Sequence, residues 1–339
     1  MIYPDVDIVI PCRNEQDYIE KCVRSFFEND YPKDKIHVFV VDGLSTDNTC
    51  EILDKLKAEF TQLTILRNEK QTTPYALNIG LKATEHPLKI IFGAHAIADK
   101  NFIKKNVEIL NNYNDVGCAG GIIENVYENK TGELIGKAMA SVFGVGNAHF
   151  RTATKFGYVD TVAFGAYKNE VFDKIGYFDE ELTRNQDDEF NYRLLKNGFK
   201  IYLSPEIKSK YYVRGNFQKL FRQYYQYGYW KVYVNKKHKT VTTVRQIVPL
   251  LFALYLFLGL LVSVFVPMFV YLYFLGIFFY IILAIVFAFK QSKKIAEAFK
   301  VAYVFFILHF SYGLGYLKGI IDFILLNKKP DRSKIKLSR

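Results

Sequence analysis

The sequence has few cysteines, and their spacing excludes the sites that cysteine builds. Four occur in 339 residues, with no Cys-x-x-Cys pair of the kind that holds structural zinc. We expect all four to be reduced, small core residues of a cytoplasmic domain; they are Cys12, Cys22, Cys50 and Cys118. The sequence also lacks Gly-x-Gly-x-x-Gly and a Walker lysine motif, which argues against a dinucleotide-binding fold and a nucleotide triphosphatase.

Charge is absent from one long stretch. No charged residue occurs from Ile247 to Phe289, which is about twice the roughly 20 residues that a helix needs to span a bilayer. We predict two membrane helices near 247–266 and 268–289, with the turn at Val266-Pro267. A single very long buried helix is the alternative, but no soluble core offers a wholly apolar surface of that length.

The formal charge of +11 is unevenly distributed. Residues 1–203 are net acidic, whereas the flanks of the apolar stretch, 204–245 and 291–339, are basic. A nucleic-acid-binding protein would need a basic face on its folded domain, so we expect no nucleic-acid partner.

Basic flanks mark the cytoplasmic side of a membrane. The beginning of the chain has no basic region before its apolar run, which predicts no secretory signal. We therefore predict a multi-pass protein of the cytoplasmic (inner) membrane with its first domain in the cytoplasm.

A further apolar segment at 301–326 is ambiguous. Gly313, Gly315 and Lys318 interrupt it, and one more crossing would export the basic tail at 327–339. We predict a re-entrant or interfacial helix pair, with a third span as the competing interpretation. The expected domains are then 1–235, with an interfacial segment near 217–235, and a membrane region at 246–326.

The first two hundred residues alternate short apolar runs with helical patterns. This alternation predicts an α/β fold in which helices cover both faces of a parallel sheet. Strands are expected at Val6–Ile10, His37–Val41, Leu63–Arg67 and Leu88–Phe92. Helices are expected at Asp17–Asn29, at Thr46–Phe60 with Ser45 or Thr46 as the cap, and at Pro74–Ala83.

Ligands of such sheets bind beyond the carboxyl ends of the strands, so the residues after each strand are informative. Glu15 follows the first strand in "PCRNE", and Asp42 and Asp47 follow the second in "DGLSTDNT". A single acid there is more often a helix cap. Two acid-bearing loops in succession favour contacts with the ribose hydroxyls or base N–H of a nucleotide.

Five motifs in order over about residues 5–235 resemble glycosyltransferase family 2. They are "VIPCRNE", "VVDGLSTDNT", "FGAYKNEVFDKIGYFDEEL", "NQDDEFNYRLLKNG" and "FRQYYQYGYWK". They are most similar to the membrane-attached bacterial branch that includes a succinoglycan-biosynthesis glucosyltransferase. The resemblance implies a GT-A fold with a mixed, mostly parallel sheet, followed here by C-terminal membrane helices. It also implies a UDP-sugar donor and transfer with inversion.

Carried over residue by residue, the resemblance assigns the donor site. Asp42 corresponds to the uracil or ribose contact and Asp47 to a support of that loop. The residues placed near the base and ribose are Pro11, Arg13, Asn14 and Glu15.

The sequence departs from the family where an Asp-x-Asp motif normally holds a divalent cation on the diphosphate. Gly93-Ala94-His95 stands in its place. His95 is either the one protein ligand to Mn²⁺ or Mg²⁺, a direct hydrogen-bond partner of a phosphate oxygen, or a structural histidine that satisfies a local backbone group. Without a metal, Arg222 and Lys231 are the cations expected to neutralise the diphosphate.

The remaining motifs place the catalytic and acceptor residues. A helix from Asp187 is expected, with Glu189 and Arg193 as an ion pair, and Asp187 corresponds to the family's general base. The resemblance assigns acceptor or gating roles to six residues: Gly165, Ala166, Gln223, Tyr224, Tyr227 and Trp230.

The resemblance thus implies an inverting hexosyltransferase that extends a lipid-linked oligosaccharide in exopolysaccharide, capsule or surface-glycan synthesis. Its partners would be a nucleotide sugar, a lipid-linked glycan and the membrane. Transfer directly onto polyprenyl phosphate and a catalytically inactive, sugar-nucleotide-binding scaffold are the alternatives. A processive synthase is less expected, because two or three membrane elements offer no channel for a polymer.

Overall fold

The structure is a computed structural model that describes residues 3–146, 156–213 and 215–330. The chain divides into two compact units, which are described separately. The first comprises Met1–Val126 and His149–Tyr212, and the second comprises Tyr127–Ala148 and Val213–Arg339. The predicted domain limits at 235 and 246 stay a prediction, and this division places 127–148 with the C-terminal helices.

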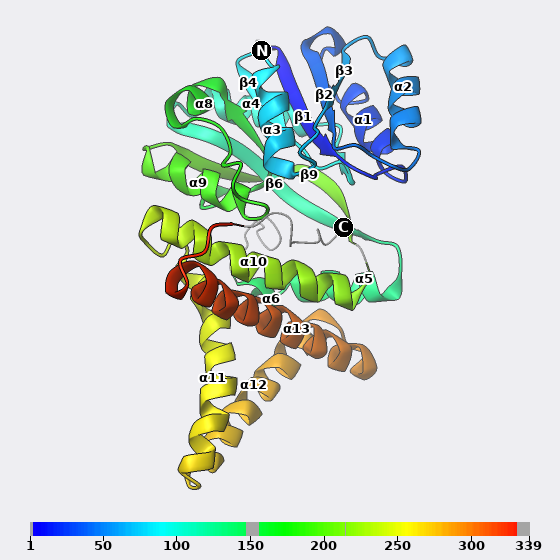
Figure 1. Ribbon diagram of the computed structural model, residues 1–339. Coiled ribbons are helices and arrows are strands. Elements are labelled where there is room, and N and C mark those ends of the chain that lie inside the picture. Colours follow the sequence, from blue (N-terminus) through cyan, green and yellow to red (C-terminus); the bar gives the residue numbers. More distant parts are fainter. Residues whose placement is uncertain (1–2, 147–155, 214, 331–339) are drawn as a thin grey trace. The chain divides into compact units, whose positions relative to one another are not determined.

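A mixed sheet of nine described strands forms the centre of the first unit (Figure 1). Its main path runs β3-β2-β1-β4-β8-β6-β9-β5, and β7 pairs with β9. Strands β1 to β4 are parallel, whereas β4–β8, β6–β8, β5–β9 and β7–β9 are antiparallel. The parallel strands are β1 (Val6–Cys12), β2 (Ile36–Asp42), β3 (Leu63–Arg67) and β4 (Leu88–Ile91). The others are β5 (Ala96–Ala98), β6 (Val116–Tyr127), β7 (Gly157–Val159), β8 (Ala163–Lys168) and β9 (Lys200–Val213).

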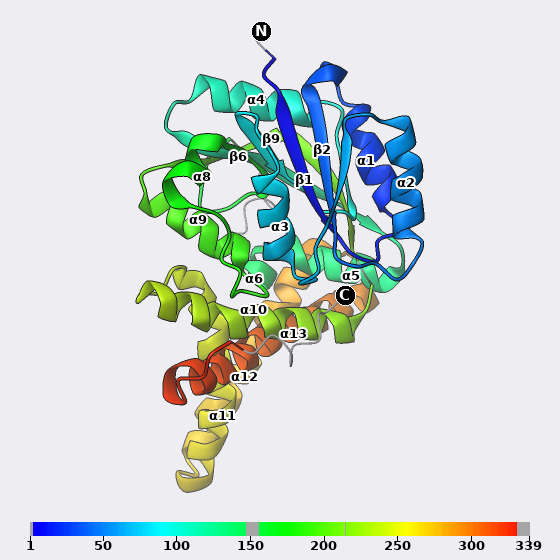
Figure 2. The ribbon, with the colours of Figure 1, turned by 45° about the horizontal axis from the view of Figure 1, so that its top comes forward.

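Helices cover both faces of the sheet (Figure 2), because alternate strand residues point to opposite faces. In β1, Ile8 and Ile10 pack in one core and Val9 in the other. The first core is completed by α1 (Ile19–Phe27), α2 (Thr49–Glu59) and α4 (Phe102–Asn112). The second is completed by α3 (Thr73–Lys82), α8 (Asn169–Ile175) and α9 (Gln186–Lys196).

The predicted strands and helices of this region are confirmed, but the predicted cap of α2 is wrong. The helix begins three residues later than expected, after Asn48. Ser45 is instead bonded to Asp42, and the backbone N–H of Thr46 donates to Asn14. The two side chains therefore organise the loop ahead of the helix.

The cysteine prediction holds for three of four residues. All four are free thiols, and Cys12, Cys22 and Cys118 are buried. Cys50 is exposed because it lies in the first turn of α2, with its Sγ 3.7 Å from Asp42 Oδ2. It is therefore a loop-facing side chain and not a core residue.

The second unit is helical. Its helices are α5 (Lys130–Met139), α6 (Val142–Val145), α10 (Phe217–His238), α11 (Val248–Phe265), α12 (Phe269–Gln291) and α13 (Ile295–Gly319), with short 3₁₀ and π turns at Val244–Ile247 and Ile320–Leu325. The helices α11 and α12 meet at Val266-Pro267, as the sequence predicts. The segments Val244–Phe265, Phe269–Gln291 and Ile295–Leu325 are long and apolar enough to cross a membrane.

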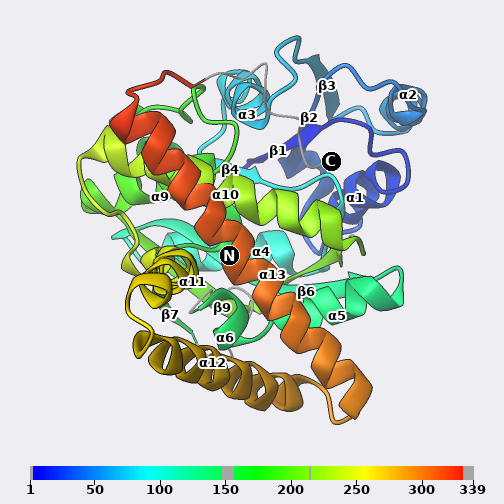
Figure 3. The same cartoon turned by 60° about the horizontal axis from the view of Figure 1, so that its bottom comes forward.

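The expected helix pair within 301–326 is one continuous helix, α13, which continues into the π turn. Its glycines mark close contacts. A side chain at Gly313 would collide with the Pro249 carbonyl, and one at Gly315 with the Tyr225 carbonyl. α13 lies beside α10 (Figure 3). It is more than half buried within its unit, unlike α11 and α12.

Candidate donor and catalytic site

Two loops at the carboxyl edge of the parallel strands form the first part of the site. In the sheet register Cys12 lies opposite Asp42, so the loops after β1 and β2 start side by side. The N–H of Gly43 donates to the Cys12 carbonyl at 2.8 Å, which extends the strand pairing into the loops. The edge predicted from the sequence is therefore the one at which these loops meet.

Side chains then join the two loops. Asn14 adopts a left-handed φ of 54°, a conformation that asparagine tolerates better than most residues. Its N–H donates to Ser45 Oγ, and its Oδ1 accepts from the Thr46 N–H, both at 2.8 Å. The N–H of Gln16 donates to Asp47 Oδ2 at 3.3 Å. The predicted donor loop is thus held by contacts of both Asn14 and Asp47.

Asp42 is largely buried and bound by its own loop. Its Oδ1 accepts from Ser45 Oγ at 2.5 Å, and its Oδ2 accepts from the Ser45 N–H at 3.1 Å. A carboxylate has about four lone-pair sites, so these bonds orient Asp42 while leaving it able to accept more. Ser45 is a site residue that the motif comparison missed. A serine three residues after an aspartate is a turn pattern that could have identified it.

Glu15 and His95 come together from different loops. Glu15 is buried, and its N–H donates to Thr49 Oγ1 at 2.9 Å. Its Oε1 lies 3.4 Å from His95 Nδ1. The His95 ring packs edge-on against Tyr211 of β9 with a centroid distance of 4.9 Å. A carboxylate beside one imidazole nitrogen orients the ring and leaves the other nitrogen for a ligand.

Gly93 permits a close contact within the site. A Cβ there would lie 3.0 Å from the Phe164 ring. Glycine at position 93 therefore leaves space for the Phe164 ring. Phe164 has a left-handed φ of 51° at the second residue of β8. Such strain at a bulky residue persists only where the surroundings impose it, often beside a functional site. No sequence pattern marks Phe164 as special.

Asp187 lies in the first turn of α9, which starts at Gln186, one residue before the expected start. Its side chain is exposed. The predicted ion pair is confirmed, with Arg193 Nε 2.7 Å from Glu189 Oε1. Asn185, which precedes the helix, has a left-handed φ of 61°. The Glu189–Arg193 pair thus lies in the helix directly after an exposed carboxylate.

Two polar atoms in the segment just before Asp187 were missed by the sequence comparison. Thr183 Oγ1 and Gln186 Oε1 are buried, and neither has a hydrogen-bond partner among the described residues. Buried polar atoms are nearly always paired in proteins. They are therefore candidates to bond a ligand hydroxyl or a water molecule.

The structure gives two predicted acceptor residues a packing role. Gly165 and Ala166 are buried in β8, between β4 and β6. A side chain at Gly165 would lie 2.8 Å from Cys118 Sγ and 2.9 Å from the Tyr167 ring. The space beside Gly165 is thus filled by the core, and the acceptor or gating role of Gly165 and Ala166 stays a prediction.

The predicted interfacial residues all lie on α10 of the second unit. Gln223 Nε2 donates to the Tyr227 hydroxyl at 2.8 Å, and the Tyr224 and Tyr227 rings are 5.5 Å apart. Trp230 is fully buried, 6.0 Å from the Phe323 ring. Trp230 therefore packs in the core, and its acceptor or gating role stays a prediction.

Of the two expected diphosphate cations, one is buried. Lys231 has no exposed surface, and its Nζ donates to Thr243 Oγ1 at 3.1 Å. Arg222 lines an open groove with Phe217, Phe221 and Tyr303. Arg222 is the better candidate for a ligand contact, because burial of Lys231 leaves it no access.

The family comparison matches residues 7–176 to the sequence model for glycosyl transferase family 2. The chain is 32% identical over 325 residues to the dolichyl N-acetyl-alpha-D-glucosaminyl phosphate 3-beta-D-2,3-diacetamido-2,3-dideoxy-beta-D-glucuronosyltransferase of Methanococcus voltae, covering 93% of this chain and 97% of that protein. It is 28% identical to succinoglycan biosynthesis protein ExoA of Rhizobium meliloti, covering 76% of this chain and 78% of that protein.

Solved structures show the same fold at low identity. The mannosyltransferase PcManGT of Pyrobaculum calidifontis, in complex with GDP-Man and Mn²⁺, superposes with a TM-score of 0.53 at 20% identity, covering 67% of this chain and 63% of that chain. S. aureus TarS 1-349 in complex with UDP-GlcNAc gives 0.51 at 19% identity, with 62% and 59% covered. The chain thus spans slightly under two thirds of these two solved proteins. The GT-A fold expected from the motifs is confirmed.

Proposed function

This chain belongs to glycosyltransferase family 2, and from that premise we propose that it transfers a sugar from a nucleotide sugar to a lipid-linked sugar acceptor with inversion. The donor is proposed to be a UDP-hexose or a derivative of one. One observation carries the proposal: the loops after β1 and β2 are joined by Asn14, Ser45 and Asp47 at the carboxyl edge of the sheet. A preformed polar edge of this kind is where such folds bind nucleotides.

The acceptor part of the proposal rests on the relative from Methanococcus voltae. Its name describes transfer to a dolichyl N-acetyl-glucosaminyl phosphate, and the match covers nearly all of both proteins. The three apolar helices support a lipid acceptor, because an enzyme held at a bilayer meets lipid-linked substrates directly. Polyprenyl phosphate without a sugar is the competing acceptor.

In the proposed reaction, Asp187 removes the proton of the attacking acceptor hydroxyl. The acceptor oxygen forms a bond to the anomeric carbon as the bond from that carbon to the diphosphate oxygen breaks on the opposite face. The proton goes to Asp187 and the electron pair leaves with the nucleoside diphosphate, which inverts the anomeric centre. An α-linked donor then gives a β-linked product. Thr183 and Gln186 are proposed to bond a water molecule or, after a local rearrangement, a sugar hydroxyl, because their buried oxygens need partners.

A divalent cation is implied by the fold family, and the residues here fit one with a single protein ligand. The segment Gly93 to His95 offers an imidazole and no carboxylate, and Glu15 next to His95 Nδ1 is the carboxylate that would orient the ring. Mg²⁺ is a hard cation that takes oxygen ligands, so an imidazole ligand favours the softer Mn²⁺. A bound cation would neutralise the diphosphate charge that develops on departure. Arg222 is the proposed protein cation if transfer proceeds without metal.

The first test compares Asp187→Asn with the unchanged protein, purified in detergent. We expect the loss of a general base to lower transfer by about 10²–10⁴-fold while UDP-sugar binding is retained. The assay offers UDP-glucose, UDP-galactose and their N-acetyl forms, with polyprenyl-phosphate-linked N-acetylglucosamine or polyprenyl phosphate as acceptors. Asp188→Asn is the matched control and should keep most of the activity. Equal turnover of Asp187→Asn and the unchanged protein would remove Asp187 from the mechanism.

The second test addresses the cation. Transfer is measured with Mn²⁺, Mg²⁺ or EDTA for the unchanged protein and for His95→Ala. Loss with EDTA and failure of Mn²⁺ to rescue His95→Ala would place the metal at His95. Activity that survives EDTA would exclude the metal and make Arg222→Met the next variant to assay. No turnover with any pair of substrates, despite UDP binding, would favour the inactive scaffold.

A further inference from the structure

A second cluster of titratable side chains lies at the opposite edge of the parallel strands. Asp5 directly precedes β1, His37 is the second residue of β2, and His86 lies two residues before β4. The register pairs Asp7 with His37 and Val6 with Leu88, so the three residues converge at the amino ends of neighbouring strands. Glu15 and Asp42 follow the carboxyl ends of the same strands. This cluster is therefore separate from the proposed donor site.

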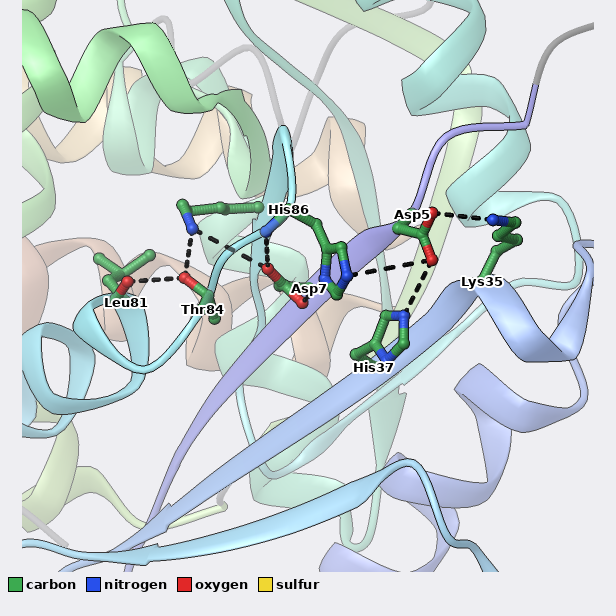
Figure 4. A network of polar contacts seen from close by, with 8 residues as sticks. Asp5, Asp7, Lys35, His37, Leu81, Thr84 and His86 are labelled. Atoms are coloured by element: carbon green, nitrogen blue, oxygen red, sulfur yellow. Dashed lines mark hydrogen bonds and ion pairs between the residues drawn. The ribbon is translucent and has the colours of Figure 1, made fainter.

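The side chains converge on Asp5 (Figure 4). His37 Nε2 lies 3.1 Å and His86 Nε2 4.0 Å from Asp5 Oδ1. One ligand atom from each of the three residues lies within 4.8 Å of the others. Ligand atoms bound at 2.0–2.2 Å to a tetrahedral zinc ion are about 3.3 Å apart. Shortening these separations by at most about 1.5 Å would therefore bring them to those of a zinc site.

The two imidazole rings are stacked, with centroids 4.2 Å apart and planes inclined by 17°. Both rings and the carboxylate are partly exposed. An ion can therefore reach the cluster from solvent, and the rings have space to tilt toward it. Tilting is needed because a ligating imidazole directs its nitrogen lone pair at the metal within the ring plane.

A buried carboxylate orients His86 from behind. Asp7 has no exposed surface, and its Oδ1 lies 2.7 Å from His86 Nδ1. Its Oδ2 accepts from the His86 backbone N–H at 2.9 Å. Because a carboxylate accepts a proton from Nδ1, the Nε2 lone pair of His86 is left on the side of Asp5. Metal-ligating histidines nearly always have such a partner on their second nitrogen.

From this geometry we infer that Asp5, His37 and His86 bind a zinc ion that fastens β1, β2 and the segment before β4 together. Two imidazoles and one carboxylate form a donor set that suits Zn²⁺, with water as the fourth ligand. The ion would join the strand ends and take no part in sugar transfer, because it lies at the edge away from the donor loops. Binding does not depend on the proposed transferase activity.

Lys35 competes with an ion at this place. Its Nζ lies 2.9 Å from Asp5 Oδ2, and its side chain is 38% exposed. An ammonium held there repels a dication, so the partly exposed side chain must turn into solvent before the ion binds. Lys35 therefore sets the affinity without blocking the site.

The experiment is calorimetric titration of Zn²⁺ into the whole chain in detergent, after removal of metals and without nucleotide. We expect His37→Gln and His86→Gln to weaken one zinc site at least tenfold, and Asp7→Asn to weaken it by about 10–100-fold. His238→Gln, the same change outside the cluster, should bind zinc as the unchanged protein does. Equal zinc affinity in His37→Gln, His86→Gln and His238→Gln would overturn the inference.

Lys35→Met is the decisive second variant, because it removes no ligand and changes a side chain that is partly exposed. We expect Lys35→Met to tighten zinc binding several-fold. Zinc should then raise the melting temperature of this variant more than it raises that of the unchanged protein. Zinc affinity that Lys35→Met leaves unchanged or weaker would show that Asp5 is not a ligand, whatever the stability of the histidine variants.

Discussion

At the scale of single residues, the donor edge depends on polar side chains that bond each other before any ligand arrives. Asp47 is one of them. Burial acts to raise its pKa, but hydrogen bonds donated by the side chain and backbone of Thr49 and by the backbone of Gln16 outweigh burial, and the pKa lies below its ordinary value. The ionised form therefore stabilises the joined loops.

This shift predicts a pH dependence of stability. A carboxyl group whose pKa is lowered in the folded state stabilises the protein above its unfolded pKa, which is about 3.9. That stabilisation is lost as the pH falls through the lower, folded pKa. We expect Asp47→Asn to lower the melting temperature at pH 7, with the difference shrinking toward pH 3.

Thermal unfolding of both proteins between pH 3 and 7 checks this expectation. Asp54→Asn, which changes a carboxyl within α2 rather than in the loop before it, is the matched control. A melting-temperature difference for Asp47→Asn that does not vary with pH would contradict the assigned cause.

At the scale of elements, the contact between α10 and α13 depends on the absence of side chains. Gly228 of α10 faces the backbone of α13, where a Cβ would lie 2.9 Å from Tyr316 N and collide with the Tyr312 carbonyl oxygen. Gly315 of α13 meets the Tyr225 carbonyl in the same way. Backbone atoms cannot move aside as a flexible side chain does.

We therefore expect Gly228→Ala to destabilise the second unit. Overpacking costs about 1–3 kcal/mol, whereas alanine in place of glycine in a helix gains only about 1 kcal/mol. Steric conflict with rigid backbone places this case at the upper end, so the free energy of unfolding should fall by roughly 1–2 kcal/mol. Gly157→Ala, whose new Cβ would meet nothing within 4 Å, should be close to neutral. Denaturant unfolding in detergent measures both.

At the scale of the whole molecule, the crossings of the membrane decide on which side each end of the chain lies. Only 11% and 17% of the most apolar windows of the first two candidate spans are buried within the protein, against 56% for Ile295–Leu325. Protein rather than lipid thus covers much of the third. We expect two crossings, by α11 and α12, with α13 at the interface on the cytoplasmic side.

Labelling with an impermeant maleimide tests this topology in membrane vesicles of known orientation. Cys50 is an exposed native thiol in the first unit. We expect Cys50 of the unchanged protein to react from one side of the membrane, and Lys329→Cys to react from the same side. Val266→Cys should react from the opposite side. Both introduced cysteines are studied in a protein that also carries Cys50→Ser. Reaction of Cys50 and of Lys329→Cys from opposite sides would mean that α13 is a third span.

Much of the fold followed from patterns that are local in sequence. The buried strands β1 to β4 read as short apolar runs, and the turn at Val266-Pro267 interrupts an uncharged stretch. The Glu189–Arg193 pair follows from helical spacing alone. Asp187 was found by likeness to other family members, because one exposed acid at a helix start has no local signature.

The sequence by itself determined the parallel strands, the polar edge with Glu15 and Asp42, and the apolar helices, because periodicity and charge are read along the chain. Only the tertiary structure decided that 127–148 joins the C-terminal helices, that Trp230 and Lys231 are buried, and that Asp5, His37 and His86 converge. These facts depend on contacts between residues far apart in the chain. Nothing in the neighbourhood of each residue encodes which distant side chain will pack against it.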